Sequence, residues 1–153
     1  MPGCALTARI GESTFFRTIC LHPNGFKDAD SGWSRVLKRF AAVALAKLFR
    51  RHGVTGWRSS QRIFSKPDFV FRQVHLAVFV DGCFWHSCPK HKTKPKNNRA
   101  FWTKKLVGNK RRDALVTRTL RRAGWQVLRI WEHGLANKNE TRLLRRMQKV
   151  LKS

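Results

Sequence analysis

The segment VHLAVFVDGCFWHSC, residues 74–88, contains the features that decide the fold. Residues 74–80 are almost continuously apolar, which is typical of a central strand buried on both faces of a sheet. Cys83, His86 and Cys88 follow closely after the end of that strand. The segment therefore predicts a buried strand that leads into a loop of metal-ligating and titratable side chains.

Apolar spacing and helix stop signals predict further elements on both sides of this strand. They are helices over residues 35–52, 99–123 and 138–152, and strands over residues 67–71, 74–80 and 125–131. Helices then cover a small mixed sheet, so we expect one three-layer α/β/α domain over residues 35–153. Residues 1–34 show no clear period and are interpreted as an atypical N-terminal arm or a cap.

The charge of the chain is strongly positive and unevenly distributed. The formal net charge is +25, from 33 Lys and Arg against 8 Asp and Glu. Residues 1–34 contain three residues of each sign, so the whole excess lies in residues 35–153. Because Lys and Arg contacts to phosphates supply most sequence-independent affinity, we expect a nucleic-acid partner. A membrane surface is the alternative, but the basic residues are spread over several elements rather than along one amphipathic helix.

The sequence has no apolar run long enough to cross a membrane and no basic start followed by an apolar segment. We therefore expect a cytoplasmic, nucleoid-associated protein without membrane contact. In that reducing compartment, four Cys residues are better explained as metal ligands or free thiols than as disulfides. Cys4 and Cys20 lie apart from the other two and are interpreted as ordinary thiols.

Cys83, Cys88 and His91 stand in a C-x4-C-x2-H arrangement, and His133 follows the strand that ends at Trp131. Two thiolates and two imidazoles make a closed tetrahedral zinc set, which would join the loop to a distant strand. The alternative is two buried free thiols and unrelated solvent-facing histidines. The spacing alone leaves both interpretations open.

Candidate catalytic groups lie at the ends of the two consecutive strands. Asp68 opens the first strand, Asp81 ends the second, and His86 lies in the loop that follows. Carboxylates from adjacent segments can meet at the sheet edge and bind Mg²⁺, and a His can act as general acid or base. Turn residues or helix caps are the alternative for isolated Asp residues.

The long helix carries a second polar group. Lys105, Asn109 and Asp113 are spaced i, i+4 and i+8, so they form one row that can face the catalytic groups. A solvated helix face with a local Lys–Asp pair is the alternative. Sequence spacing does not decide between the two.

Aromatic residues lie beside basic ones in and after the loop. Phe84 and Trp85 fall between Cys83 and His86, and Trp102 opens the following helix. Such a combination is what a base-stacking or wedge-insertion surface requires, whereas most aromatic pairs are core. The flanking basic residues are Lys90, Lys92, Lys94, Lys96 and Arg99.

The chain resembles the Vsr endonucleases of very short patch repair from about residue 45 to 150. The resemblance rests on KPDFVF at residues 66–71 and VFVDGCFWHSCP at residues 78–89. It continues in family order and spacing through Pro95, Asn98, Phe101-Trp102, Lys105, Asn109, Arg112-Asp113, Gly124-Trp125, Val127 and Trp131-Glu132-His133.

This resemblance implies a fold like that of type II restriction endonucleases and nicking of double-stranded DNA 5′ to the T of a T·G mismatch. It implies that Asp68 binds Mg²⁺, helped by the carbonyl of Val80, and that His86 is the acid/base group. Asn109 and Asp113 would support the site. It also implies an aromatic wedge of Phe84, Trp85 and Trp102, and a structural zinc site of Cys83, Cys88, His91 and His133. A monomer is expected, with repair-pathway proteins as further partners.

Three features differ from the family pattern. Residues 35–52 contain no acidic residue, although relatives usually carry one in this helix near the catalytic centre. Asp81 stands where some members have His, and residues 1–34 do not resemble the usual N-terminal segment. Two alternatives therefore stand beside mismatch nicking: a catalytically impaired, zinc-containing DNA-binding relative, and a nicking nuclease of the same fold with another target.

Overall fold

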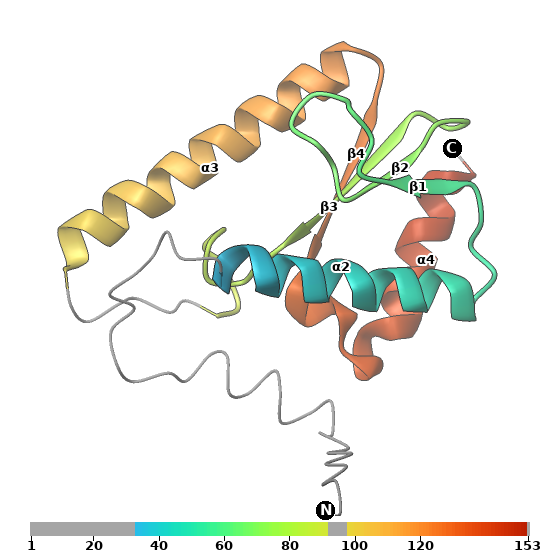
Figure 1. Cartoon of the computed structure of the whole chain (residues 1–153), viewed down its shortest axis with the longest axis horizontal. Helices are drawn as coiled ribbons and strands as arrows, with labels where there is room; N and C mark the ends of the chain where they lie inside the picture. Colours follow the sequence, from blue (N-terminus) through green and yellow to red (C-terminus); the bar gives the residue numbers. More distant parts are fainter. Residues whose placement is uncertain (1–32, 92–97, 153) are drawn as a thin grey trace, which may run out of the picture.

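The computed structural model describes residues 33–91 and 98–152, with side chains from residue 38 onward. Most of the predicted arm at residues 1–34 and the predicted DNA contact Lys96 lie outside these residues, as do Cys4 and Cys20. The elements are α2 (Trp33–Arg51), β1 (Trp57–Ser59), β2 (Phe69–Phe71), β3 (Leu76–Asp81), α3 (Arg99–Arg122), β4 (Gln126–Trp131), the short 3-10 helices η1 (Glu132–Leu135) and η2 (Asn137–Asn139), and α4 (Glu140–Leu151), as drawn in Figure 1.

The strands form one four-stranded mixed sheet in the order β1-β2-β3-β4. β1 pairs with β2 and β2 with β3 in antiparallel fashion, while β3 and β4 are parallel and are connected through α3. Every residue of β3 is buried, as its apolar sequence predicts. The parallel pairing brings Asp81 level with Trp131, so the loops that follow β3 and β4 leave the sheet at the same end.

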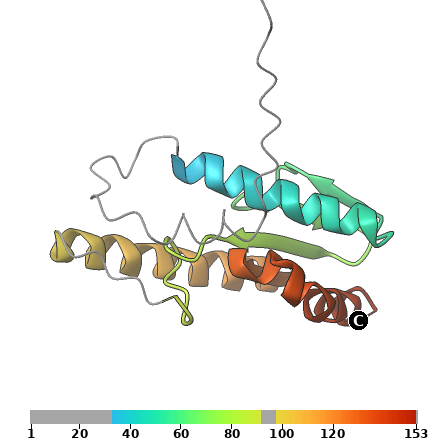
Figure 2. The same ribbon diagram turned by 90° about the horizontal axis from the view of Figure 1, so that it is seen from below.

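Helices cover both faces of the sheet, and Figure 2 shows α2 and α3 on opposite sides of it. The larger core cluster joins Leu45, Leu48 and Phe49 of α2 to one face of the sheet, and α4 adds Leu143 and Met147 to it. The smaller cluster, on the other face, is made of Ala77, Phe79, Val116 and Leu120. The predicted three-layer α/β/α arrangement with a mixed sheet is therefore present.

One strand is missing from the sequence prediction. β1 has three residues, of which Arg58 and Ser59 are exposed, so no alternation of apolar and polar residues marks it. Trp57 fixes it in place: its ring meets Phe69 edge to face at 5.2 Å, and its indole nitrogen donates to the carbonyl of Val54. This strand forms through tertiary packing rather than local preference. Among the described residues, no helix is both long and apolar enough to cross a bilayer.

Candidate active site and metal centre

The loop after β3 is folded back on itself by short-range backbone hydrogen bonds. The amide of His86 donates to the carbonyl of Gly82 at 3.2 Å, and the amide of Cys88 donates to that of Cys83 at 2.9 Å. Ser87 has φ 52°, the left-handed conformation that helps reverse the chain. These turns bring the two cysteines together at the end of β3.

A compact Cys/His cluster forms at this point from the four predicted ligands. Nδ1 of His133, in η1, lies 3.2 Å from Sγ of Cys83 and 3.6 Å from Sγ of Cys88. The ring of His91 meets that of His133 edge to face, with centroids 4.9 Å apart. One potential ligand atom from each residue lies within 4.8 Å of all the others. The loop and the segment after β4 are therefore joined by four metal-ligating side chains.

The donor set of this cluster fits zinc. Zn–S and Zn–N bonds of about 2.0–2.3 Å set tetrahedral ligand atoms roughly 3.5 Å apart, which agrees with the spacing around His133. Nδ1 of His91 is buried and has no hydrogen-bond partner among the described residues, and a ligating role accounts for it. Burial raises the pKa of the Cys83 thiol to about 12, so its thiolate requires a nearby cation. Burial also lowers the pKa of His133, which favours the neutral, metal-binding imidazole.

Asp68 precedes β2 and lies beside the end of β3. One of its oxygens accepts a hydrogen bond from the amide of Val80 at 2.8 Å, and the other lies 3.6 Å from Nζ of Lys38 in α2. Burial raises the pKa of Asp68, and the ammonium of Lys38 offsets part of that rise. The helix α2, which contains no acidic residue, thus places the ammonium of Lys38 beside the carboxylate of Asp68.

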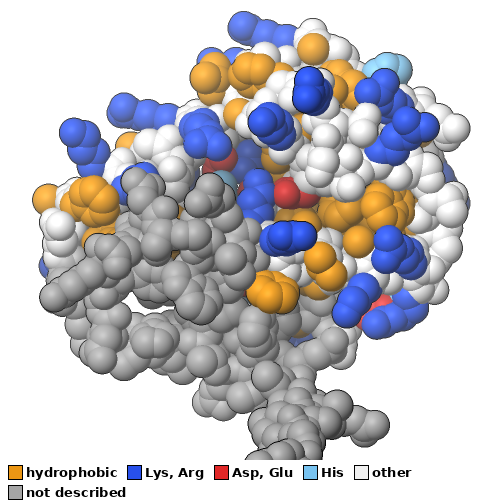
Figure 3. All heavy atoms as spheres, in the orientation of Figure 1, with side chains coloured by type: hydrophobic (Ala, Val, Ile, Leu, Met, Phe, Trp, Pro, Cys, Tyr) orange, Lys and Arg blue, Asp and Glu red, His pale blue; other side chains and the backbone are white. Residues whose placement is uncertain are grey.

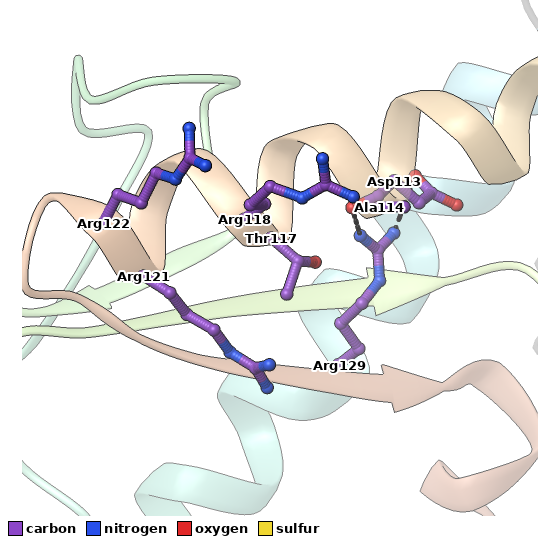
Figure 4. A pocket seen from close by; sticks show the side chains of 7 residues that line it. All are labelled: Asp113, Ala114, Thr117, Arg118, Arg121, Arg122 and Arg129. Carbon is purple, nitrogen blue, oxygen red and sulfur yellow. Dashed lines mark hydrogen bonds and ion pairs between the residues drawn. The ribbon is translucent and has the colours of Figure 1, made fainter.

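Arg129 of β4 holds the other two carboxylates. Its guanidinium makes a two-point contact with Asp81, through Nε at 2.6 Å and Nη2 at 2.7 Å. Nη2 also lies 2.9 Å from Oδ1 of Asp113, an ion pair marked in Figure 4. Asp81 is only 4% exposed, so its charge depends on this partner.

His86 is fixed by a carboxylate on α3. Its Nδ1 lies 2.5 Å from Oδ2 of Asp113, and 3.9 Å from Asp81. Since Nδ1 faces Asp113, Nε2 is the ring nitrogen left for chemistry. A chain of contacts therefore runs from Arg129 through Asp113 to His86.

The polar row of α3 faces this centre in part. Asn109 donates to the carbonyl of Trp85 at 2.9 Å, so it supports the loop backbone, and Asp113 holds His86. Lys105 is partly buried on the same side of the helix, and Arg99 is exposed at its start. Neither forms an ion pair with any residue in the described ranges.

Three predicted wedge residues pack together beside His86. Phe84 meets Trp85 at 5.2 Å and Trp102 at 5.3 Å between ring centroids, both edge to face. Trp102 is 7% exposed and forms the buried base of this aromatic cluster. Phe101, which the sequence reasoning left without a role, contacts Trp102 and is 47% exposed.

The surface around the centre is basic. On the face drawn in Figure 3, the acidic side chains near the middle are surrounded by Lys and Arg side chains. A positive rim around partly exposed carboxylates is expected to attract a phosphate backbone toward this centre.

Sequence reasoning missed two residues of this centre, Lys38 and Arg129. A basic residue with apolar neighbours on both sides in β4 is a weak signal for Arg129. Lys38 carries no signal at all, because the chain is rich in exposed Lys and Arg.

Comparison with known proteins places these residues in a family context. Residues 39–92 match the family described as DNA mismatch endonuclease Vsr. The type II nicking enzyme V.NaeI of Lentzea aerocolonigenes is 53% identical over 68 residues, which are 44% of this chain and 41% of that enzyme. V.NmeDIP of Neisseria meningitidis serogroup C, also a type II nicking enzyme, is 45% identical over 101 residues, 65% of this chain and 68% of the enzyme.

The DNA mismatch endonuclease Vsr of Escherichia coli (strain K12) is 32% identical over 98 residues, which are 63% of this chain and 62% of that protein. Across these three relatives, the matched part of the chain spans between 41% and 68% of their length.

Proposed function

This chain belongs to the Vsr family of DNA endonucleases, and we propose that it nicks one strand of duplex DNA 5′ to the T of a T·G mismatch. The reaction is metal-dependent phosphodiester hydrolysis. The observation that carries the proposal is the convergence, at the end of β3, of Asp68 with the His86–Asp113 pair.

Asp68 is the carboxylate suited to Mg²⁺. Asp81 and Asp113 both contact Arg129, whereas among the described residues Asp68 is held by the backbone amide of Val80 and by half-exposed Lys38. Mg²⁺ is commonly bound through one or two carboxylates, waters and substrate phosphates, so one carboxylate fits. The carbonyl of Val80 points to the same edge of β3 as the amide of Val80, which donates to Asp68. This carbonyl could therefore bind the same cation as Asp68. The cation would neutralise charge that develops on the phosphate oxygens.

His86 is the proton-transfer group in this proposal. Nε2 accepts a proton from a water molecule whose oxygen attacks phosphorus, while the bond from phosphorus to the leaving sugar oxygen breaks and that oxygen takes a proton from solvent to form a hydroxyl. Asp113 fixes the ring orientation and stabilises the imidazolium that forms, and Arg129 positions Asp113.

The aromatic cluster supports recognition of a weakened base pair. Phe84 and Trp85 directly precede His86 in the sequence. Insertion of either ring beside a mismatched base would therefore bring the DNA backbone close to the proton-transfer group. Trp102 supports the cluster from beneath, and the exposed ring of Phe101 extends it. Wedge insertion costs least at a mismatched step, which provides a physical basis for mismatch preference.

A second candidate is a nicking nuclease with another target, because V.NaeI and V.NmeDIP carry the name type II nicking enzyme. The chemistry would be the same, and the recognised DNA would differ. The zinc-containing, non-catalytic binder is the third possibility and is favoured only by the acid-free first helix.

A nicking assay with Mg²⁺ separates these functions. A T·G duplex is compared with its matched T·A duplex and with a panel of other mismatches, and Asp68→Ala serves as the blank. Nicking of the T·G duplex alone supports mismatch repair, and nicking of other duplexes supports another target. Tight binding without any nick supports the non-catalytic binder.

A further inference from the structure

The outer face of α3 carries a row of basic residues away from the catalytic centre. Lys104, Arg111, Arg118 and Arg122 are all exposed and follow one another at intervals of seven, seven and four residues. At 3.6 residues and 5.4 Å per turn, they lie along one side of the helix over about 27 Å. In Figure 4, Arg122 projects from the side of α3 that faces away from the strands. We call these four residues the outer basic face.

Among the described residues, no acidic side chain forms an ion pair with this face. Asp113 is the one acidic residue in the sequence of α3, and it is engaged by His86 and Arg129. Four uncompensated cations in a row repel one another, and a polyanion that lies along them relieves that repulsion.

Small side chains between these cations leave the helix open to close approach. One shallow hollow lies beside Ala100, Val107 and Gly108, between Lys104 and Arg111. A second hollow, shown in Figure 4, is lined by Arg118 and Arg122 but also by Asp113 and Arg129, so it opens toward the carboxylate centre and is not part of the outer basic face.

Gly108 is the more informative of these small residues. A side chain there would meet nothing within 4 Å, so packing inside the protein does not require glycine. Glycine in a helix interior is unfavourable relative to alanine, and a partner that comes close to the helix provides a reason for it.

The outer basic face and the residues of the proposed catalytic centre lie on different sides of α3. Trp102, Asn109 and Asp113 lie on the side of α3 that faces the sheet and loop, about half a helical turn from the row. A phosphate held between Asp68 and His86 therefore lies on the other side of the helix.

We propose that the outer basic face of α3 is a second, sequence-independent binding site for the phosphate backbone of a separate DNA duplex. The inference goes beyond nicking, since it concerns a surface outside the catalytic centre. A protein with two such surfaces holds two DNA segments at once, which allows transfer from one segment to another without release.

Binding stoichiometry tests this site. Sedimentation velocity with fluorescent duplexes of about 12 base pairs, roughly 40 Å long, counts the duplexes bound by the full chain at low salt. We expect two duplexes per chain. Arg111→Glu/Arg118→Glu is expected to bind one, and Arg142→Glu/Lys149→Glu on α4 is the control. Both pairs are exposed and seven residues apart, so they match in charge change and spacing.

The salt dependence of the weaker binding event gives a second readout. The measured quantity is the slope of log K against log salt concentration. Each phosphate contact contributes about 0.9 to the steepness of this slope, so replacing both Arg111 and Arg118 by Ala should make it shallower by about two. One duplex per wild-type chain, or equal losses in the α4 control, would overturn the proposal. Loss of the tighter duplex-binding event in the α3 variant would also overturn the proposal. The outer basic face would then be part of the surface that binds the cleaved DNA.

Gly108→Leu provides a test without any change of charge. The substitution is expected to raise the melting temperature, because leucine favours helix, and to weaken the second duplex several-fold by filling the hollow. Unchanged binding of the second duplex would contradict the proposed close approach. Nicking of a T·G duplex is measured in the same samples, so that a failure of the proposed catalysis is distinguished from a failure of this site.

Discussion

The loop after β3 contributes to two centres that are built in opposite ways. In the Cys/His cluster, two thiols and two imidazoles converge within 4.8 Å, and one buried ring nitrogen has no partner among the described residues. In the catalytic centre, every carboxylate already has a cation beside it, from Lys38 or from Arg129.

The two centres therefore depend on different interactions. The Cys/His cluster is a donor set that a bound zinc ion would stabilise, and we therefore propose that it contributes to the folding of the chain. In the proposed catalytic centre, basic side chains of the described residues already neutralise the carboxylates, and half-exposed Lys38 lies beside Asp68, the residue proposed to bind a divalent cation. We expect substitutions in the Cys/His cluster to reduce the stability of the fold. Substitutions in the proposed catalytic centre are expected to reduce the rate of nicking.

The largest effect is expected from Cys88→Ser. Structural zinc binding contributes about 10–16 kcal/mol in zinc-finger peptides, which is comparable to the whole stability of a domain. We therefore expect loss of bound zinc and of the cooperative thermal transition, as measured by elemental analysis and calorimetry. Cys4→Ser is the matched control. Unchanged zinc content and melting temperature in Cys88→Ser would refute the zinc assignment.

His86→Ala sharpens the comparison from the other side. A positioned acid/base group contributes about 10²–10⁴-fold to rate, and we expect a loss of that size in single-turnover nicking. The melting temperature should change little, because the side chain is partly exposed. His75→Ala, an exposed histidine in the turn before β3, is the control. An equal loss in both variants would argue against a catalytic role.

Arg129→Met tests whether the catalytic centre also carries stability. It leaves Asp81, which is 4% exposed, without its partner, and breaking such a buried pair costs about 3–5 kcal/mol. Denaturant unfolding measures the loss. Addition of Asp81→Leu should restore part of the free energy of unfolding, because the unpaired charge is removed. An Arg129→Met variant with the same free energy of unfolding as wild type would show that the Arg129–Asp81 ion pair does not contribute to stability.

Lys38→Gln should have the smallest effect. The ammonium competes with a divalent cation for Asp68, but half-exposed ion pairs are worth about 0–1 kcal/mol. We therefore expect the Mg²⁺ concentration that gives half-maximal nicking to fall about two- to fivefold. The dissociation constant of Mg²⁺ measured by calorimetry should fall by the same factor. Lys47→Gln on the same helix is the control. Collapse of the rate at saturating Mg²⁺ would instead place Lys38 in the chemistry.

The sequence predicted the features that have a local pattern. Buried β3, the long helix α3 and the amphipathic α4 follow from apolar spacing. Residue type left the Cys/His cluster open, and the family resemblance implied its four members, which the structure brings together. Arg129 and β1 could not be predicted in this way. Arg129 depends on the parallel pairing of β4 with β3, and β1 depends on the packing of Trp57 against Phe69. Both are contacts between segments distant in sequence.

The most direct test of the two-centre account is the single-turnover nicking rate of Asp68→Ala on a T·G duplex, with zinc content measured in the same sample. For Asp68→Ala we expect bound zinc, retained DNA binding and no nick, whereas we expect the wild-type chain to nick the strand that carries the T. Nicking by Asp68→Ala at the wild-type rate would contradict the central claim that the chemistry resides at the end of β3 beside Asp68.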